Sequence, residues 1–177
     1  MNSRMRAGVS SLIVIGVFAA AYGLMNPMFG RDDDSTGPAL VTKMPPGYRD
    51  WKVISVAHEE GNLHSFAVVL GNDVAIKAYR HGTLPFPDGA IIAALHYSHV
   101  PSEENNKVFG QPQSFVPGSP TNVQFMIKDS TRYAATGGWG FAHFKDGKPA
   151  DAAFLKSCFP CHQKAPASDL VFTHYAP

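Results

Sequence analysis

The sequence predicts an α+β domain made mostly of an antiparallel β-sheet with short helices. Up to five strand-like segments occur before residue 145, and a short helix follows them near the C-terminal end. Runs of strands followed by a helix are typical of the α+β class. The 177-residue chain also contains 16 Gly and 14 Pro, which indicates many turns and argues against a helical bundle.

The first two strands are predicted at residues 51–58 and 65–70, which are rich in apolar and β-branched side chains. The sequence Glu-Gly-Asn at 60–62 separates them and favours a turn. Two adjacent strands joined by a short turn predict a hairpin, and therefore an antiparallel sheet.

A short helix and a third strand come next. Asn72 is a suitable N-cap for a helix that continues to Arg80, and Gly82 is a suitable residue to end it. The proline-rich sequence at 85–89 predicts a rigid turn. Residues 90–97 are nearly all apolar, so we expect a strand that is buried on both faces or lines a pocket.

The second half of the domain is expected to contain a long loop, two further strands and a final helix. The loop covers residues 101–120, which are polar and rich in Gly and Pro, and loops of this length are often functional. Side chains alternate through 123–128, and 138–144 is the fifth predicted strand. Asp151 is a suitable N-cap for a helix that carries the chain to Cys158.

The clearest functional motif lies on that helix, where residues 158–162 read C-F-P-C-H. Cys-x-x-Cys-His is the attachment signature of a c-type haem. Cys158 and Cys161 would each form a thioether with a vinyl group, and His162 would ligate the iron as the proximal imidazole. The expected cofactor is therefore one covalent haem c with its iron. Pro160 lacks an N–H, so the helix should break or restart there.

Three other interpretations of the two cysteines are less favoured. A zinc site needs four ligands, but the chain has no second cysteine pair and His174 is the only later histidine. A thioredoxin-type redox pair opens a helix early in a βαβ fold, whereas only residues 163–177 follow here. A disulfide between Cys158 and Cys161 would leave His162 without a role.

The N-terminal segment has the features of a targeting signal. Arg4 and Arg6 precede an apolar run at 9–25, which contains small residues suitable for cleavage. Residues 1–25 are therefore expected to be a signal peptide or, less favoured, an N-terminal membrane anchor. Either would make the body periplasmic, free or anchored to the inner membrane. This suits haem c, because its thioethers are made outside the cytoplasm in bacteria.

Residues 26–46 predict an extended linker, because an acidic run is combined with several prolines and glycines. The haem domain is then expected at 47–177. The formal net charge of the whole chain is +1, so the composition gives no reason to expect nucleic acid as a partner.

Six short motifs follow one another through this domain: Y-R-D-W at 48–51, G-N-D-V-A-I-K-A-Y-R at 71–80, L-P-F-P-D-G at 84–89, F-M-I-K-D-S at 125–130, G-G-W-G-F at 137–141 and C-F-P-C-H at 158–162. In order and spacing they resemble the cytochrome P-460 family over nearly all of residues 45–175. The resemblance implies a mostly antiparallel β-fold, a single haem c with a proximal histidine, and often a homodimer.

The resemblance also implies one of two behaviours. Some members carry a lysine cross-linked to the porphyrin and oxidise hydroxylamine. Others, of the cytochrome c-prime-beta type, lack that bond and bind small gases such as nitric oxide in an apolar distal pocket. The lysine is expected on the strand at 90–97, which contains none; the nearest lysines, Lys77 and Lys107, lie in other elements. Gln124 lies where an acidic distal group is expected, and an amide cannot accept the proton.

The sequence therefore favours a protein that binds a small ligand, with nitric oxide the leading candidate, at an open iron site. An oxidoreductase acting on hydroxylamine or nitric oxide is the alternative. A third reading is an electron-transfer cytochrome with a redox partner protein, which would need a second iron ligand. His96, on the apolar third strand, is the most interesting of the candidates, which are His58, His64, His81, His96, His99, His143, His174, Met44 and Met126.

The haem propionates are expected to pair with arginine, because a planar guanidinium matches a carboxylate in a bidentate manner. Arg80 is preferred over Arg49 and Arg132, since it lies in the family-like sequence A-Y-R.

Overall fold

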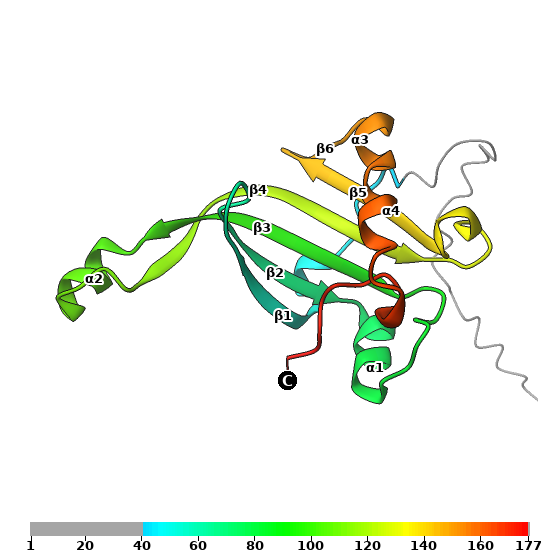
Figure 1. The fold of residues 1–177 in the computed structure, drawn as a ribbon, viewed down its shortest axis with the longest axis horizontal. Helices are drawn as coiled ribbons and strands as arrows, with labels where there is room; N and C mark the ends of the chain where they lie inside the picture. Colours follow the sequence, from blue (N-terminus) through cyan, green and yellow to red (C-terminus); the bar gives the residue numbers. More distant parts are fainter. Residues whose placement is uncertain (1–40, 177) are drawn as a thin grey trace, which may run out of the picture. The chain divides into compact units, whose positions relative to one another are not determined.

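The structure is a computed structural model that describes residues 41–176. Its centre is a six-stranded antiparallel sheet in which each strand pairs with its neighbours in the sequence (Figure 1). The strands are β1 Lys52–Glu59, β2 Ser65–Gly71, β3 Ile91–Pro101, β4 Phe115–Lys128, β5 Trp139–Lys145 and β6 Lys148–Pro149. The predicted signal or anchor at 1–25 lies outside the described residues, as does most of the predicted linker.

Short helices flank these strands, and the predicted α+β class is confirmed. They are α1 Asp73–His81, α2 Glu103–Phe109, α3 Ala152–Lys156 and α4 Cys158–His162, with the 3-10 turns η1 Tyr48–Asp50, η2 Ala134–Thr136 and η3 Pro166–Ser168. The two-residue strand β6 was not predicted. Within residues 41–176, no helix is both long and apolar enough to cross a membrane.

Helix α1 begins and ends where the capping residues predict. The Asn72 side chain accepts a hydrogen bond from the Ala75 backbone N–H at 3.0 Å. The same oxygen accepts the Ile91 N–H at 3.0 Å, and the amide nitrogen donates to the Gly89 carbonyl at 2.8 Å. Gly82 adopts the left-handed conformation that ends the helix. Asn72 therefore both caps α1 and fixes it to the start of β3.

The prediction of a loop over residues 101–120 is wrong. Strand β3 continues to Pro101, α2 follows it, and β4 begins at Phe115, so this segment forms an arm that extends the β3–β4 hairpin (Figure 1). The polar sequence supplies the caps of α2. Ser102 accepts a hydrogen bond from the Asn105 N–H at 3.3 Å, and Gly110 ends the helix with a positive φ.

Prolines in this arm suggested a loop because proline cannot donate to a strand ladder. In the structure Pro117 pairs with His99 and Pro120 with Tyr97, while β5 pairs with β4 only from Val123 onward. Both prolines therefore lie on a part of β4 whose second edge has no partner among the described strands. An unpaired edge tolerates the missing N–H.

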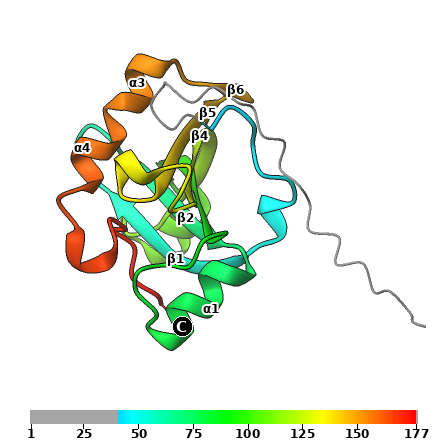
Figure 2. The same ribbon diagram turned by 90° about the vertical axis from the view of Figure 1, so that its right-hand side faces the viewer.

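The two faces of the sheet carry separate apolar clusters. One cluster includes Phe125, Phe144 and Leu95, together with Val41 from the segment before β1. The other includes Met126, Phe141 and Ile92, with α1 and residues of the C-terminal segment packed against it. Figure 2 shows α3, α4 and the C-terminal segment on one side of the sheet and the segment before β1 on the other.

Candidate functional site

A cavity of about 590 Å³ lies between the sheet and the segment that contains α3, α4 and residues 171–174. This volume is within the range of small-molecule and cofactor sites. On the sheet side, Ala57, Ala67 and Ala94 line the cavity from three neighbouring strands. Their methyl side chains leave space above the sheet that larger side chains would fill.

The opposite wall brings together the three residues of the predicted attachment motif. Cys158, Cys161 and His162 all line the cavity, and both cysteines are free thiols. The helix break expected at Pro160 lies instead at Ser157, between α3 and α4. Pro160 falls in the first turn of α4, where its missing N–H removes no helical hydrogen bond.

The His162 imidazole is held in one orientation and one tautomer. Its Nδ1 lies 2.8 Å from the Leu170 carbonyl oxygen, so Nδ1 carries the proton and donates, and Nε2 keeps its lone pair. The ring lies between Phe141 and Phe172, with centroid distances of 5.0 and 4.9 Å. Burial lowers the pKa of His162, which favours the neutral form. A neutral, oriented imidazole of this kind can ligate a metal.

The Leu170 carbonyl is positioned by Asp169, which precedes it. Asp169 and Leu170 have positive φ angles of 52° and 68°, which residues other than glycine rarely adopt. Asp169 forms an ion pair with Lys128 at 2.9 Å, and both side chains are nearly buried, at 12% and 6% exposed. The Asp169 carboxylate also accepts the Phe86 N–H at 2.8 Å, and its carbonyl accepts the Trp139 indole N–H at 2.8 Å.

We call His162, Leu170, Asp169 and Lys128 the His162 corner. The sequence analysis missed its last three members. Lys128 gave a weak signal, since it directly follows the apolar residues Met126 and Ile127 at the end of a predicted strand. Asp169 gave none, because its ionic partner lies 41 residues earlier in the chain.

The C-terminal segment that closes the cavity is tied to the rest of the domain. The Tyr79 hydroxyl, on α1, donates a hydrogen bond to the Thr173 carbonyl at 3.0 Å. The Ala176 N–H donates to the Ile54 carbonyl of β1 at 2.9 Å. Phe172, Thr173 and the predicted ligand candidate His174 therefore have fixed places in the wall.

Two histidines, His96 and His143, line the cavity from the sheet, and we call them the sheet-side histidines. His96 is 8% exposed, and its Nδ1 lies 3.8 Å from a carboxylate oxygen of Glu59. The Nδ1 atom of His143 is buried and has no hydrogen-bond partner in the structure. Burial is the main cause that lowers the pKa of both imidazoles.

A buried nitrogen without a partner is uncommon in a folded protein. The unpartnered Nδ1 atom of His143 faces a cavity that also contains two thiols and an oriented imidazole. Such a cavity suits a bound group that has both apolar and polar parts. A haem is such a group, so the residues present suit it.

Other predicted site residues lie away from this cavity. Arg80 is exposed on the last turn of α1, and its Nε donates to the Tyr175 hydroxyl at 3.1 Å. Arg49 and Arg132 lie over the rings of Tyr48 and Tyr133. None of the three arginines lines the cavity. Helix α1 buries Ala75, Ile76 and Ala78, which turns Arg80 to solvent.

Of the remaining predicted site residues, some line the cavity and others do not. Met126 and Gln124 line the cavity, so side chains of β4 that alternate with Phe125 face it. His58, His64, His81, His99 and Met44 are not among the lining residues. Glu59, which the sequence analysis did not single out, does line the cavity. No lysine is found among the lining residues that the structure describes.

Comparison with known families agrees with this arrangement. The family model described as Cytochrome P460 matches residues 45–173, a span that contains all six strands, α4 and every residue lining the cavity except His174. A search of curated proteins gave no significant match. The family match covers most of the chain, so the resemblance noted from the sequence is confirmed. The chain belongs to the cytochrome P460 family of haem-binding cytochromes.

Proposed function

We propose that this cytochrome holds one covalent haem c in the cavity and binds a small ligand, nitric oxide in particular, at an open iron position. The observation that carries the proposal is the single wall formed by Cys158, Cys161 and His162. In this proposal the two thiols supply the thioether sulfurs and His162 supplies the proximal nitrogen. The iron supplies a coordination position for a diatomic gas.

The chain's own contribution on the proximal side is orientation. The Leu170 carbonyl accepts the Nδ1–H of His162, which directs the lone pair to Nε2. The same hydrogen bond makes the imidazole a stronger donor to a metal. The rings of Phe141 and Phe172, which both pack against the imidazole, limit its rotation.

The proposal favours gas binding over a cross-linked porphyrin, because no lysine lies where a bond between lysine and porphyrin is expected. Strand β3 contains no lysine, and none lines the cavity over residues 41–176. Lys128 belongs to the His162 corner, but its ammonium is bound to Asp169 at 2.9 Å and to the Gly137 carbonyl at 3.1 Å. An ammonium held in this way is not free to react with a porphyrin carbon.

A second candidate function, oxidation of hydroxylamine or nitric oxide, is favoured by Glu59. This carboxylate lines the cavity 3.8 Å from the His96 imidazole, so the pair could accept a proton from a bound substrate. Gln124 cannot do so, since its amide nitrogen donates to Asn122 at 3.2 Å and its oxygen is a weak base. The electron-transfer reading rests on His96, His143, His174 and Met126 as possible second ligands in the cavity wall.

Export to the periplasm, attachment to the inner membrane, a homodimer and a redox partner protein belong to the same proposal. They rest on the N-terminal sequence and on the expected behaviour of the family.

The optical spectrum of the purified ferrous protein, co-expressed with haem c maturation proteins, tests the proposal. A high-spin spectrum that shifts promptly on addition of nitric oxide or carbon monoxide supports an open iron site. A low-spin spectrum that ignores the gas supports an electron carrier. A strongly red-shifted Soret band supports a cross-linked oxidase, and absence of any haem band would overturn the whole assignment.

A further inference from the structure

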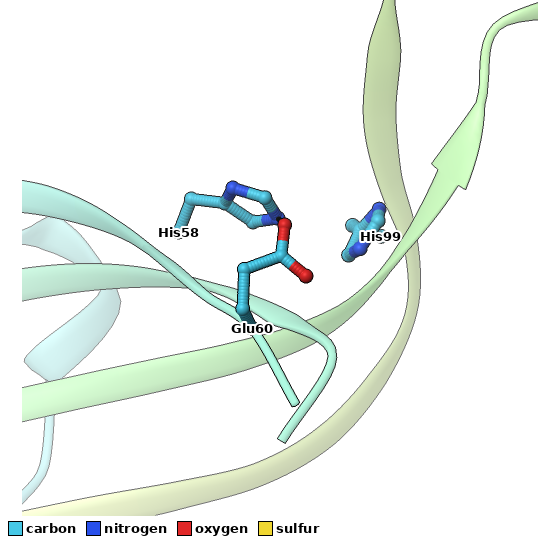
Figure 3. A group of neighbouring side chains, drawn as sticks. All are labelled: His58, Glu60 and His99. Atoms are coloured by element: carbon cyan, nitrogen blue, oxygen red, sulfur yellow. Dashed lines mark ion pairs between the residues drawn. The ribbon is translucent and has the colours of Figure 1, made fainter. Parts of the chain in front are cut away.

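A second group of chemically active side chains lies where the β1–β2 hairpin meets β3. It consists of His58, Glu60, His64 and His99, and we call it the hairpin cluster; Figure 3 shows three of its members. None of the four lines the haem cavity. The side chains of a strand alternate between its faces, so Glu59 points into the cavity and His58 points to the opposite face.

The ligand atoms of the cluster converge. One atom from each of His58, Glu60 and His99 lies within 4.8 Å of the others, as the arrangement of the side chains in Figure 3 illustrates. His58 Nε2 is 3.3 Å from a Glu60 carboxylate oxygen. His99 Nε2 is 3.1 Å from His64 Nδ1.

These spacings are close to those of a coordination sphere. In a tetrahedral zinc site with bonds of about 2.1 Å, neighbouring ligand atoms are about 3.4 Å apart. The two close pairs of the cluster already have this separation. His58, Glu60 and His64 are exposed, so small side-chain movements would bring the pairs together around one ion.

His99 is the buried member of the cluster. Its side chain is buried, with the residue only 7% exposed, and its Nδ1 has no hydrogen-bond partner in the structure. Its other nitrogen meets only the imidazole of His64. An imidazole gives only one nitrogen to an ion, so Nε2, which faces His64, would bind the metal and Nδ1 would keep the proton.

The surroundings of His99 suit a metal ligand. The rings of Phe66 and Phe115 pack against it at centroid distances of 5.5 and 5.0 Å, which limits water and fixes the ring.

We propose that the hairpin cluster is a second metal site, separate from the haem, that binds a divalent cation of the zinc class through His58, His64, His99 and Glu60. Imidazole nitrogens with one carboxylate are a typical zinc set. Calcium and magnesium select oxygen ligands and are not expected to bind here.

The test is a Zn²⁺ titration of the full chain loaded with haem, in competition with a chromogenic chelator. In that form the thiols and His162 are engaged, so they do not compete for zinc. One equivalent of Zn²⁺ should bind to the wild-type protein, and Mg²⁺ should not displace it. His58→Ala and His99→Ala should each weaken Zn²⁺ binding more than tenfold, on the scale of losses seen for altered metal sites.

His81→Ala is the matched control, because His81 is an exposed histidine on α1 outside the cluster. It should bind Zn²⁺ as the wild type does. Glu60→Gln is a second cluster variant that should fold normally, because it changes one exposed residue after β1. Zn²⁺ should raise the melting temperature of the wild type more than that of this variant.

The proposal is overturned if the wild type binds no zinc, or if the cluster variants and His81→Ala bind it equally well. Either result leaves the haem proposal intact, because no cluster residue takes part in it.

Discussion

The His162 corner and the sheet-side histidines face the same cavity but are built in opposite ways. In the corner, His162 Nδ1, the Asp169 carboxylate and the Lys128 ammonium all have partners within 3.1 Å. On the sheet, His143 Nδ1 has no partner and His96 has only a carboxylate at 3.8 Å. The fold alone therefore fixes the proximal geometry, whereas the sheet side is left for a bound molecule to complete.

The largest effect is expected when the two cysteines next to His162, which would anchor the haem, are removed. Replacing both Cys158 and Cys161 by Ala should abolish covalent retention of haem, because no other cysteine exists to form a thioether. Acid–solvent extraction followed by a haem stain of the denatured protein measures this. The Cys158→Ala single variant is the control and should keep one thioether. Haem that stays covalently bound in the double variant would contradict the proposed anchors.

A second way to break the corner is to remove the lysine. Lys128→Met leaves the Asp169 carboxylate nearly buried without its cation, which should lower the free energy of unfolding by about 3–5 kcal/mol. Urea denaturation measures the change.

Lys52→Ala is a matched control, because Lys52 and Asp73 form an ion pair of the same length, 2.9 Å, with side chains 59% and 91% exposed. Its expected cost is below about 1 kcal/mol. Equal losses in the two variants would show that the Lys128–Asp169 pair has no special role. In folded Lys128→Met protein, a changed ferrous spectrum would show that the Leu170 carbonyl no longer orients His162.

The sheet side can be probed by pH. Burial lowers the pKa of His143 from its ordinary value of 6.5, so below that value the unfolded chain binds more protons than the folded one. Stability should therefore fall as the pH drops through about 6.5. His143→Phe removes this titration and should lose less stability on acidification, as compared by urea midpoints at pH about 7.5 and about 5. An unchanged pH dependence would contradict the prediction.

The smallest effect is expected at Arg80. Its contact with Tyr175 is exposed, so Arg80→Ala should leave the free energy of unfolding nearly unchanged. The ferrous spectrum should also be unchanged, because Arg80 does not line the cavity. A shifted Soret band in this variant would restore the expectation that Arg80 pairs with a haem propionate.

Local chemistry explains what the sequence could predict. The cap at Asn72, the stop at Gly82 and the cavity-facing C-F-P-C-H motif depend on neighbours in the chain, and the structure contains all of them. The alternation in β4 correctly placed Met126 and Phe125 on opposite faces of the sheet, in separate apolar clusters, but it did not show which face would meet the cavity.

Longer-range features could not be predicted in the same way. The pairing of Lys128 with Asp169 requires the final turn of the chain to fold back on β4. The arm at 101–120 reads as a loop because its prolines are compatible with a strand only where one edge is unpaired. The place of Arg80 outside the cavity lining could not be predicted, because a motif gives the neighbours of a residue in sequence but not the direction in which the helix points its side chain.

The two sides of the cavity come from different parts of the chain, and their order has a consequence for assembly of the protein. Synthesis proceeds from the N-terminus, and every strand of the sheet pairs with one that has already emerged. Helix α4, which bears both thiols, follows all six strands. The sheet that forms the cavity floor is thus complete in the sequence before α4 begins, and under the proposed covalent attachment the haem would be joined to the wall that is added to this sheet last.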